Sequence, residues 1–230
     1  MKNNIINQEN EISELEIPRT LKDIKANLLT QIVKKFYCLE KNVLSDKSIE
    51  TLEKGILTCK YLDTNNLNRD FISTKGFSIV FKSKFIDKVK KEFPFFEDYI
   101  DLALDDGCNA FYLNPLIMSN NSRVDGHIDR SLRAYLKTID PPSYVSVLYV
   151  KVPENIQGGE LSISHNKKSV GFVKPSKNTL VYFQGHLNHS VSQVKNDITR
   201  ISLVCEQYYL NERELESIPD FIVESRKLKY

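Results

Sequence analysis

The chain has 230 residues, and 41% of them are hydrophobic, which is enough for one domain with a sizeable core. The 32 basic and 30 acidic residues leave a net charge of +2, too even a balance to indicate a basic surface for nucleic-acid phosphates. Four cysteines without Cys-x-x-Cys spacing predict reduced thiols. With no long apolar stretch and no signal-peptide core, we expect a cytoplasmic protein that does not contact a membrane.

The first half of the chain predicts mostly helices. Residues 1–17 are rich in Asn and Glu and are expected to be loosely ordered. After Pro18, apolar residues recur at helical spacing over about 21–36 and again over about 47–62. A third helical zone is predicted over 85–104, where Pro94 breaks or restarts the helix, and residues 77–81 are typical of a strand.

After Gly107 the pattern changes to short β-branched and aromatic runs separated by turn residues. About eight strands at this spacing predict a sandwich, a jelly roll or a barrel, with the helices against one outer face. A final helix is predicted over about 212–228, where Asn211 and Glu214 fit a capping box. The predicted strands cover residues 109–113, 126–129, 144–152, 160–164, 171–173, 179–183, 190–194 and 200–210.

These elements together predict a mainly β protein with helices packed outside, in the α+β class. We expect residues 18–230 to form a single domain. In this prediction, residues 18–105 give helical support, residues 108–210 form the β-core, and the helix at 212–228 closes the chain.

Two of the four histidines and one aspartate predict a metal site. His127 and Asp129 are two apart in a predicted strand, so their side chains point to the same face. His189 begins a later predicted strand, which gives it a defined direction, whereas His186 lies in a turn and His165 at a hairpin tip. Two histidines and a carboxylate on one side of a metal form the facial triad of non-haem Fe(II) oxygenases, so these three are the candidate ligands.

Arg200 follows His189 at the start of another predicted strand. Alternation places Ser202 on the same face as Arg200, with Ile201 and Leu203 on the opposite face. A guanidinium fork binds a carboxylate bidentately, and a hydroxyl can add a hydrogen bond. Next to a metal site, this pair favours a carboxylate-bearing co-substrate over a surface ion pair.

Five motifs in this order resemble the Fe(II)/2-oxoglutarate-dependent dioxygenases, most closely the prolyl 4-hydroxylase-like branch. The resemblance covers about residues 108–210. It is carried by His127-Ile128-Asp129, the strand at 144–150, Gly158-Gly159-Glu160-Leu161, the segment at 174–183, and His189-Ser190-Val191 followed by Arg200-Ile201-Ser202.

The resemblance implies a double-stranded β-helix (jelly roll) preceded by N-terminal helices. It implies Fe(II) held by His127, Asp129 and His189, with 2-oxoglutarate and O2 as co-substrates and with binding of L-ascorbic acid. Arg200 and Ser202 would bind the distal carboxylate of 2-oxoglutarate. Tyr112 is the candidate for the tyrosine that often assists them, although the segment between it and His127 is longer than the family pattern and lacks the glycine that usually follows the tyrosine.

Two positions distinguish the chain from related families that share these motifs. Related halogenases have a small residue in place of the carboxylate, so the presence of Asp129 favours hydroxylation. The nucleic-acid demethylases carry a second arginine six residues after the first, and this chain has Glu206 there. With the balanced charge, this argues against a nucleic-acid partner.

The sequence therefore predicts an oxygenase that couples decarboxylation of 2-oxoglutarate to hydroxylation of an unactivated C–H bond. The expected substrate is an amino acid, a peptide or protein residue such as proline, or a natural-product intermediate. Arg123 and Arg130 flank the metal motif, and either could bind a substrate carboxylate or be a solvated charge. A non-catalytic jelly-roll metal-binding or sensor protein is the alternative. A cupin-type isomerase or hydrolase would usually present more histidines.

Overall fold

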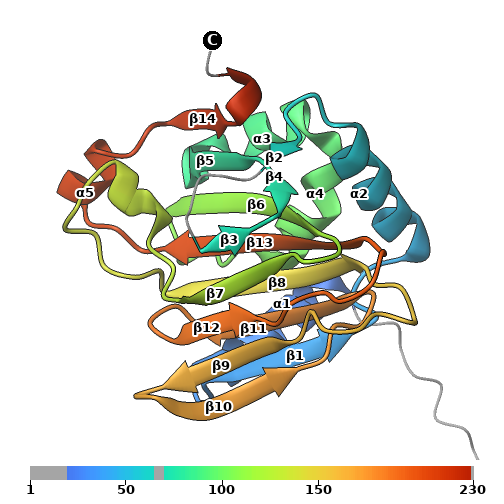
Figure 1. The fold of residues 1–230 in the computed structure, drawn as a ribbon. Helices are drawn as coiled ribbons and strands as arrows, with labels where there is room; N and C mark the ends of the chain where they lie inside the picture. Colours follow the sequence, from blue (N-terminus) through green and yellow to red (C-terminus); the bar gives the residue numbers. More distant parts are fainter. Residues whose placement is uncertain (1–19, 65–69, 229–230) are drawn as a thin grey trace, which may run out of the picture.

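Two antiparallel sheets lie face to face, and helices cover the outer face of the larger sheet (Figure 1). The computed structural model describes residues 20–64 and 70–228. The helices are α1 (Leu21–Ile32), α2 (Asp46–Thr58), α3 (Ile86–Glu92), α4 (Glu97–Ala103) and α5 (Glu212–Glu216), with 3-10 turns η1 (Ser83–Phe85), η2 (Pro94–Phe96), η3 (Ser131–Ala134) and η4 (Arg226–Leu228).

Within the described residues, the larger sheet has nine strands and the smaller has five. The central path of the larger sheet is β1-β11-β8-β13-β6-β4-β2, with β5 paired to β6 and β14 paired to β5; the smaller sheet has the order β10-β9-β12-β7-β3. The strands are β1 (Tyr37–Lys41), β2 (Asp63–Thr64), β3 (Phe71–Ile72), β4 (Lys75–Gly76), β5 (Ser78–Lys82), β6 (Ala110–Met118), β7 (Arg123–His127), β8 (Tyr144–Lys151), β9 (Leu161–His165), β10 (Lys168–Val173), β11 (Thr179–Gln184), β12 (Asn188–Val191), β13 (Arg200–Tyr208) and β14 (Phe221–Glu224).

Strand alternation divides the apolar residues of the larger sheet between two cores. On β13, Ile201 and Leu203 point outward and pack with buried residues of the helices, such as Leu28 and Ile49. Inward-facing residues of β8 and β11 pack against the smaller sheet, and this second core surrounds the site described below. The prediction that the helices lie against one outer face of the β-core is therefore confirmed.

The helix boundaries follow local signals. Thr20 caps α1 through a capping box with Asp23, and Ser45 caps α2 by accepting a hydrogen bond from the Ser48 backbone. Pro94 interrupts the third helical zone, which divides into α3, η2 and α4 as predicted. The predicted first and second helices are both too long. The first ends at Ile32, and the segment after it forms the edge strand β1; the second ends at Thr58.

The prediction of a C-terminal helix over 212–228 is wrong beyond its first turn. The capping box of Asn211 and Glu214 forms as expected, but α5 has only five residues. Pro219 has no backbone N–H to continue a helix and disfavours helical geometry in the residue before it. The following β-branched run pairs with β5 as β14, with Val223 opposite Ile79.

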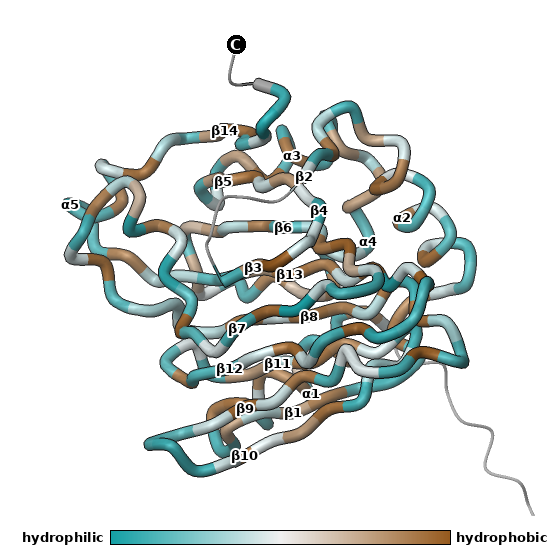
Figure 2. The backbone as a smooth tube through the Cα atoms, viewed as in Figure 1, coloured by the Kyte–Doolittle hydropathy of each residue, from teal (hydrophilic) through white to brown (hydrophobic). Residues whose placement is uncertain are grey.

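The hairpin of β9 and β10 ends in a hydrophilic tip (Figure 2). His165 ends β9, and Asn166 and Lys167 both have positive φ, at 49° and 65°, as a tight hairpin turn requires. This agrees with the prediction for His165. The prediction for residues 1–17 lies outside the described residues, and no helix in the described part is long and apolar enough to cross a bilayer.

Candidate metal centre

His127, Asp129 and His189 converge at one end of the smaller sheet. His127 is the last residue of β7 and pairs directly with His189 on β12. Asp129 lies just after the strand, so the prediction that it shares a strand face with His127 is wrong in detail. Because the chain bends after His127, the carboxylate nevertheless returns to both imidazoles.

The three side chains form a compact donor set. The Nε2 atom of His127 lies 3.1 Å from one carboxylate oxygen of Asp129, and Nε2 of His189 lies 3.4 Å from the other. One ligand atom from each residue lies within 4.8 Å of the other two. Each side chain is at most 8% exposed. Donors bound at about 2.1 Å to one ion lie roughly 3 Å apart, so these separations fit a shared cation.

Backbone carbonyl groups orient both imidazole rings. Nδ1 of His127 donates to the Asp125 carbonyl at 2.9 Å, and Nδ1 of His189 donates to the Leu187 carbonyl at 3.3 Å. Because a carbonyl can only accept, each Nδ1 carries a proton, and each Nε2 faces Asp129. This is the arrangement in which outer hydrogen bonds prepare histidines as metal ligands.

The pKa values of the triad reflect burial opposed by mutual charge. Burial lowers the pKa of His127, but the hydrogen bond and charge of Asp129 outweigh it and raise the pKa to about 9. For Asp129, burial raises the pKa, while the charge of His189 and the hydrogen bond from His127 produce a net decrease. Burial lowers the pKa of His189, which leaves that ring neutral at neutral pH. The site therefore offers one carboxylate and an imidazole that is ready to coordinate, with His127 losing one proton to a bound cation.

A small cavity of about 40 Å³ adjoins the triad, and we refer to it as the small cavity. Its wall is mainly apolar, but Tyr149, Arg200 and Ser202 also line it. Arg200 and Ser202 face the same cavity, as strand alternation predicts. The guanidinium of Arg200 lies 4.8 Å from the centre of the Tyr149 ring.

Arg200 is 1% exposed and has few partners. Its Nη1 donates to the Gly159 carbonyl at 2.9 Å and lies 3.3 Å from the sulfur of Met118, while Nε has no partner in the described part of the chain. Burial lowers the pKa of the guanidinium, and Tyr149 and Glu160 oppose that effect. Among the described residues no carboxylate forms an ion pair with it, so a buried cation faces the small cavity without a protein counter-ion.

The Gly158-Gly159 motif helps to hold Arg200. Both glycines have positive φ, at 84° and 78°, and a Cβ atom at Gly158 would lie 1.9 Å from the Gln193 carbonyl oxygen. Only glycine fits this turn, and the turn presents the Gly159 carbonyl to the guanidinium. The motif therefore contributes to the site through its backbone.

Four buried polar atoms around the small cavity lack hydrogen-bond partners within the described residues. They are Oδ2 of Asp129, the hydroxyl of Tyr149, Nε of Arg200 and Oγ of Ser202. Each orphaned buried group costs free energy of about 1–3 kcal/mol. Several such atoms at one cavity are the pattern of a site built to bind a polar ligand.

Tyr112 does not lie with Arg200. Its hydroxyl accepts a hydrogen bond from Ser78 at 2.5 Å, and its ring lines a different cavity. Tyr149 stands beside Arg200 instead, and the sequence reasoning missed it. Strand alternation along 144–152 could have identified Tyr149, since it shares the inward face with Val145 and Val147.

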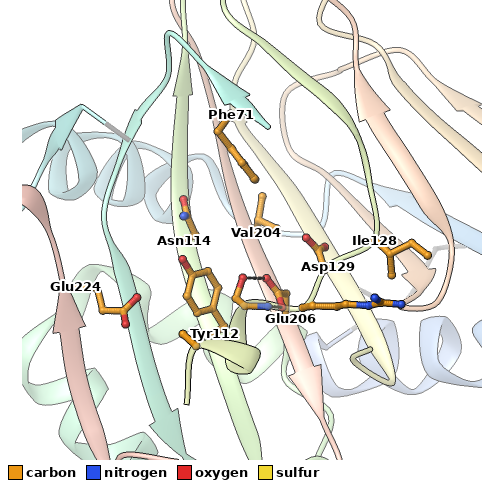
Figure 3. A pocket seen from close by; sticks show the side chains of 11 residues that line it. Phe71, Tyr112, Asn114, Ile128, Asp129, Val204, Glu206 and Glu224 are labelled. Carbon is orange, nitrogen blue, oxygen red and sulfur yellow. Dashed lines mark hydrogen bonds between the residues drawn. The ribbon is translucent and has the colours of Figure 1, made fainter. Parts of the chain in front are cut away.

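A second cavity of about 330 Å³, which we call the large cavity, adjoins Asp129 on another side. The two cavities share Phe71, Asp129 and Val204 in their walls. Figure 3 shows Asn114 and Tyr112 between Glu224 on one side and Asp129 on the other. The polar lining of the large cavity consists of Tyr112, Asn114, Asp129, Arg130, Ser131, Glu206 and Glu224.

The other histidine and the two arginines that were considered for the site differ in their positions. His186 is exposed and its ring packs against His165, away from the triad. Arg123 forms an ion pair with Asp125 at 2.9 Å. Arg130 lines the large cavity and makes no side-chain hydrogen bond or ion pair with the described residues. Of the two flanking arginines, Arg130 is therefore the one available to a ligand.

Comparison with known proteins gives a consistent result. Residues 113–205 match the family model of the 2OG-Fe(II) oxygenase superfamily. Similar solved structures include a prolyl-4-hydroxylase from Pseudomonas putida, with 14% identity, a TM-score of 0.57, and coverage of 81% of this chain and 99% of that chain. A 2OG-Fe(II) oxygenase family oxidoreductase from Burkholderia pseudomallei has 13% identity and a TM-score of 0.55, over 84% of this chain and 92% of that one.

A third similar structure is a prolyl hydroxylase from Trichoplax adhaerens in complex with a hypoxia inducible factor oxygen degradation domain peptide fragment. It has 13% identity and a TM-score of 0.56, and covers 84% of this chain and 93% of that one. At these identities the likeness establishes the fold, which confirms the double-stranded β-helix core preceded by helices. No curated protein matches the chain by sequence.

Proposed function

We propose that the chain, whose residues 113–205 match the 2OG-Fe(II) oxygenase superfamily, is a member of it and hydroxylates an unactivated C–H bond of an amino acid, a peptide or protein residue such as proline, or a natural-product intermediate. The family and the facial triad of His127, Asp129 and His189 imply Fe(II) and 2-oxoglutarate. When bound, they supply the oxidising chemistry: O2 and 2-oxoglutarate give succinate and CO2, and one oxygen atom enters the C–H bond of the substrate.

The triad fits Fe(II) by its donor chemistry. Two neutral imidazole nitrogens and one carboxylate on one side suit this metal, and the opposite side is left for co-substrates. The orphaned Oδ2 atom of Asp129 and the two backbone-oriented rings support this assignment. The protein's own contribution is to hold the three donors in place and to shield them in an apolar wall.

Arg200 is the residue that we propose binds the distal carboxylate of 2-oxoglutarate. The observation that carries the proposal is its buried guanidinium, which faces the small cavity without a protein counter-ion. Ser202 and Tyr149 would each donate a hydrogen bond, because both hydroxyls line the same cavity without partners. A dicarboxylate reaching from the triad to Arg200 would satisfy all of these groups at once.

The large cavity is the proposed site of the primary substrate. It shares Asp129 with the small cavity, so a molecule bound there lies beside the metal ligands. Its volume of about 330 Å³ is suited to a small molecule or one residue of a peptide. The Trichoplax neighbour was solved with a peptide fragment, which supports a peptide as one of the possible substrate types.

A non-catalytic metal-binding or sensor protein remains the rival function. A protein that only holds a metal has no need for a carboxylate clamp beside it, so Arg200 favours the enzyme. The test is to supply the purified protein with Fe(II), 2-oxoglutarate and O2 and to screen amino acids and peptides for substrate-stimulated succinate release. Succinate should form in equal amounts with the hydroxylated product. Tight Fe(II) binding without succinate from any compound would support the rival.

A further inference from the structure

Asn114 presents a buried, unused acceptor to the large cavity. It lies on β6 and is 6% exposed, and its amide nitrogen donates to Ser78 Oγ at 3.3 Å. Its carbonyl oxygen Oδ1 has no partner within the described residues. Because a buried acceptor without a donor is costly, this position calls for a ligand that donates a hydrogen bond.

Glu224 adds a negative charge to the same cavity. It reaches the wall from β14, and one of its oxygens accepts a hydrogen bond from the Tyr135 hydroxyl at 2.5 Å. It forms no ion pair with any described residue, so its other oxygen is available to a ligand. Tyr135 therefore orients a carboxylate that has no cation of its own.

The second glutamate in the cavity wall, Glu206, already has hydrogen-bond partners within the protein. Both oxygens of Glu206 accept hydrogen bonds from Ser131, through its backbone N–H and its hydroxyl, and from the Tyr208 hydroxyl. Arg130 supplies the only positive charge among the described residues that line the cavity, and it directly follows Asp129 in the chain. The cavity thus has a cation next to Asp129 and acceptors at Asn114 and Glu224.

We infer that the primary substrate is a free amino acid with a basic side chain, whose ammonium group lies between Glu224 and Asn114 and whose carboxylate faces Arg130. The inference rests on the proposed function and narrows its substrate class. The aliphatic carbons of such a molecule lie between the two charged ends, in the cavity that Asp129 borders. A prolyl residue within a peptide has no N–H and no charge at its ring nitrogen, so it would leave these acceptors unsatisfied.

Binding can be measured by calorimetry on the metal-free protein with matched ligands. L-lysine and L-norleucine have the same carbon chain, but only lysine carries the terminal amine. An ammonium that donates to a carboxylate and an amide should give lysine at least about tenfold higher affinity. Nε-acetyl-lysine should bind like norleucine. L-ornithine tests the length of the site, and equal affinities for norleucine and both diamino acids would overturn the inference.

Substitutions test which residues bind the side-chain amine and which residue binds the carboxylate of the substrate. Glu224→Gln and Asn114→Leu should each reduce the preference for lysine over norleucine. Glu224→Lys should bind L-2-aminoadipate, which has a terminal carboxylate, more tightly than lysine. Arg130→Gln should weaken lysine and norleucine together. Glu154→Gln, at an exposed loop residue that does not line the cavity, is the matched control and should leave all these affinities unchanged. If both Glu224 variants keep the wild-type preference for lysine, the amine site is overturned. If Asn114→Leu does not fold, the preference of Glu224→Lys for L-2-aminoadipate over lysine still tests the site.

Doubly blocked Nα-acetyl-lysine amide separates a free amino acid from a lysyl residue. If it binds as tightly as lysine, the carboxylate contact at Arg130 is refuted, and the free amino acid with it. Failure of the proposed function has a different signature, in which lysine binds but no compound stimulates succinate release. If a neutral peptide drives succinate release and no basic amino acid binds, the function stands and this inference is overturned.

Discussion

The small and large cavities share three wall residues, yet their buried polar atoms differ in kind. Around the small cavity the unpaired cation is Arg200, accompanied by two hydroxyls and embedded in apolar side chains. Away from Asp129, the large cavity offers two acceptors: the amide oxygen of Asn114, which has no partner within the described residues, and the carboxylate of Glu224, which accepts from Tyr135 but forms no ion pair there. The small cavity suits an anion, whereas the end of the large cavity at Asn114 and Glu224 suits a cation.

A single strand spans both cavities. On β13, Arg200 and Ser202 line the small cavity, Val204 borders both, and Glu206 lines the large one. Successive inward positions therefore pass from one ligand site to the next across the metal ligand Asp129. The comparison predicts that substitutions in one cavity change the affinity for one ligand and leave the other ligand's affinity nearly unchanged.

Removal of the metal ligands should have the largest effect. His127→Ala, Asp129→Ala and His189→Ala should each reduce succinate formation to background, because each removes one donor from the Fe(II) site. Equilibrium dialysis with Fe(II) measures the loss of metal binding directly. His186→Ala is the matched control, since its exposed ring lies outside the triad. Full succinate formation in any triad variant would refute the assignment.

Arg200→Ala should separate the two cavities most sharply. Loss of one partner of a buried charge pair costs about 2 kcal/mol or more, which corresponds to an increase of about 30-fold in the KM for 2-oxoglutarate. The affinity for a basic amino acid, measured by calorimetry, should stay within about twofold. Arg123→Ala removes an arginine that is already paired with Asp125 and serves as the control. An unchanged KM would mean that the carboxylate clamp lies elsewhere.

Tyr149→Phe should have a smaller effect of the same type. One hydrogen bond from a neutral donor is worth about 0.5–1.5 kcal/mol, so the KM for 2-oxoglutarate should rise by roughly twofold to tenfold. Tyr112→Phe should leave this KM unchanged, because Tyr112 lines the large cavity. The opposite result, in which only Tyr112→Phe raises the KM, would restore Tyr112 as the tyrosine that assists Arg200.

Glu206→Gln should have the smallest effect, on stability. Burial, followed by the charge of Asp129, raises the pKa of Glu206 from 4.5 to about 8. The folded state thus binds this proton more tightly than the unfolded chain. The contribution of protonated Glu206 to the free energy of unfolding is therefore complete below the unfolded pKa and is lost as the pH rises through 8. Urea denaturation of the metal-free protein at several pH values between about 5 and 8 should show a steeper loss in wild type than in Glu206→Gln. Parallel curves would contradict this account.

The sequence alone predicted the metal triad and the residues that share the small cavity with it. Turn residues and period-two alternation are local signals, and alternation placed Arg200 and Ser202 on one face. For Asp129 the signal was only its closeness to His127 in the chain, because the carboxylate reaches the triad through the bend after β7. Alternation also correctly assigned the outward residues of β13 to the helix-facing core. These signals depend on near neighbours in the chain, so they needed no knowledge of the folded structure.

Tertiary structure alone decided the large cavity. Glu224 was expected in a helix, but Pro219 ended the helix and the segment paired with β5, which placed this carboxylate near Asn114. Alternation places Tyr149 on the inward face of its strand, but it does not say which tyrosine lies beside Arg200. The register within the larger sheet decided that, because it sets Tyr149 opposite Ser202 and Tyr112 opposite Glu206. The physical reason is that such contacts join residues far apart in sequence, and their free energy depends on which edges and faces remain unpaired when the sheets assemble.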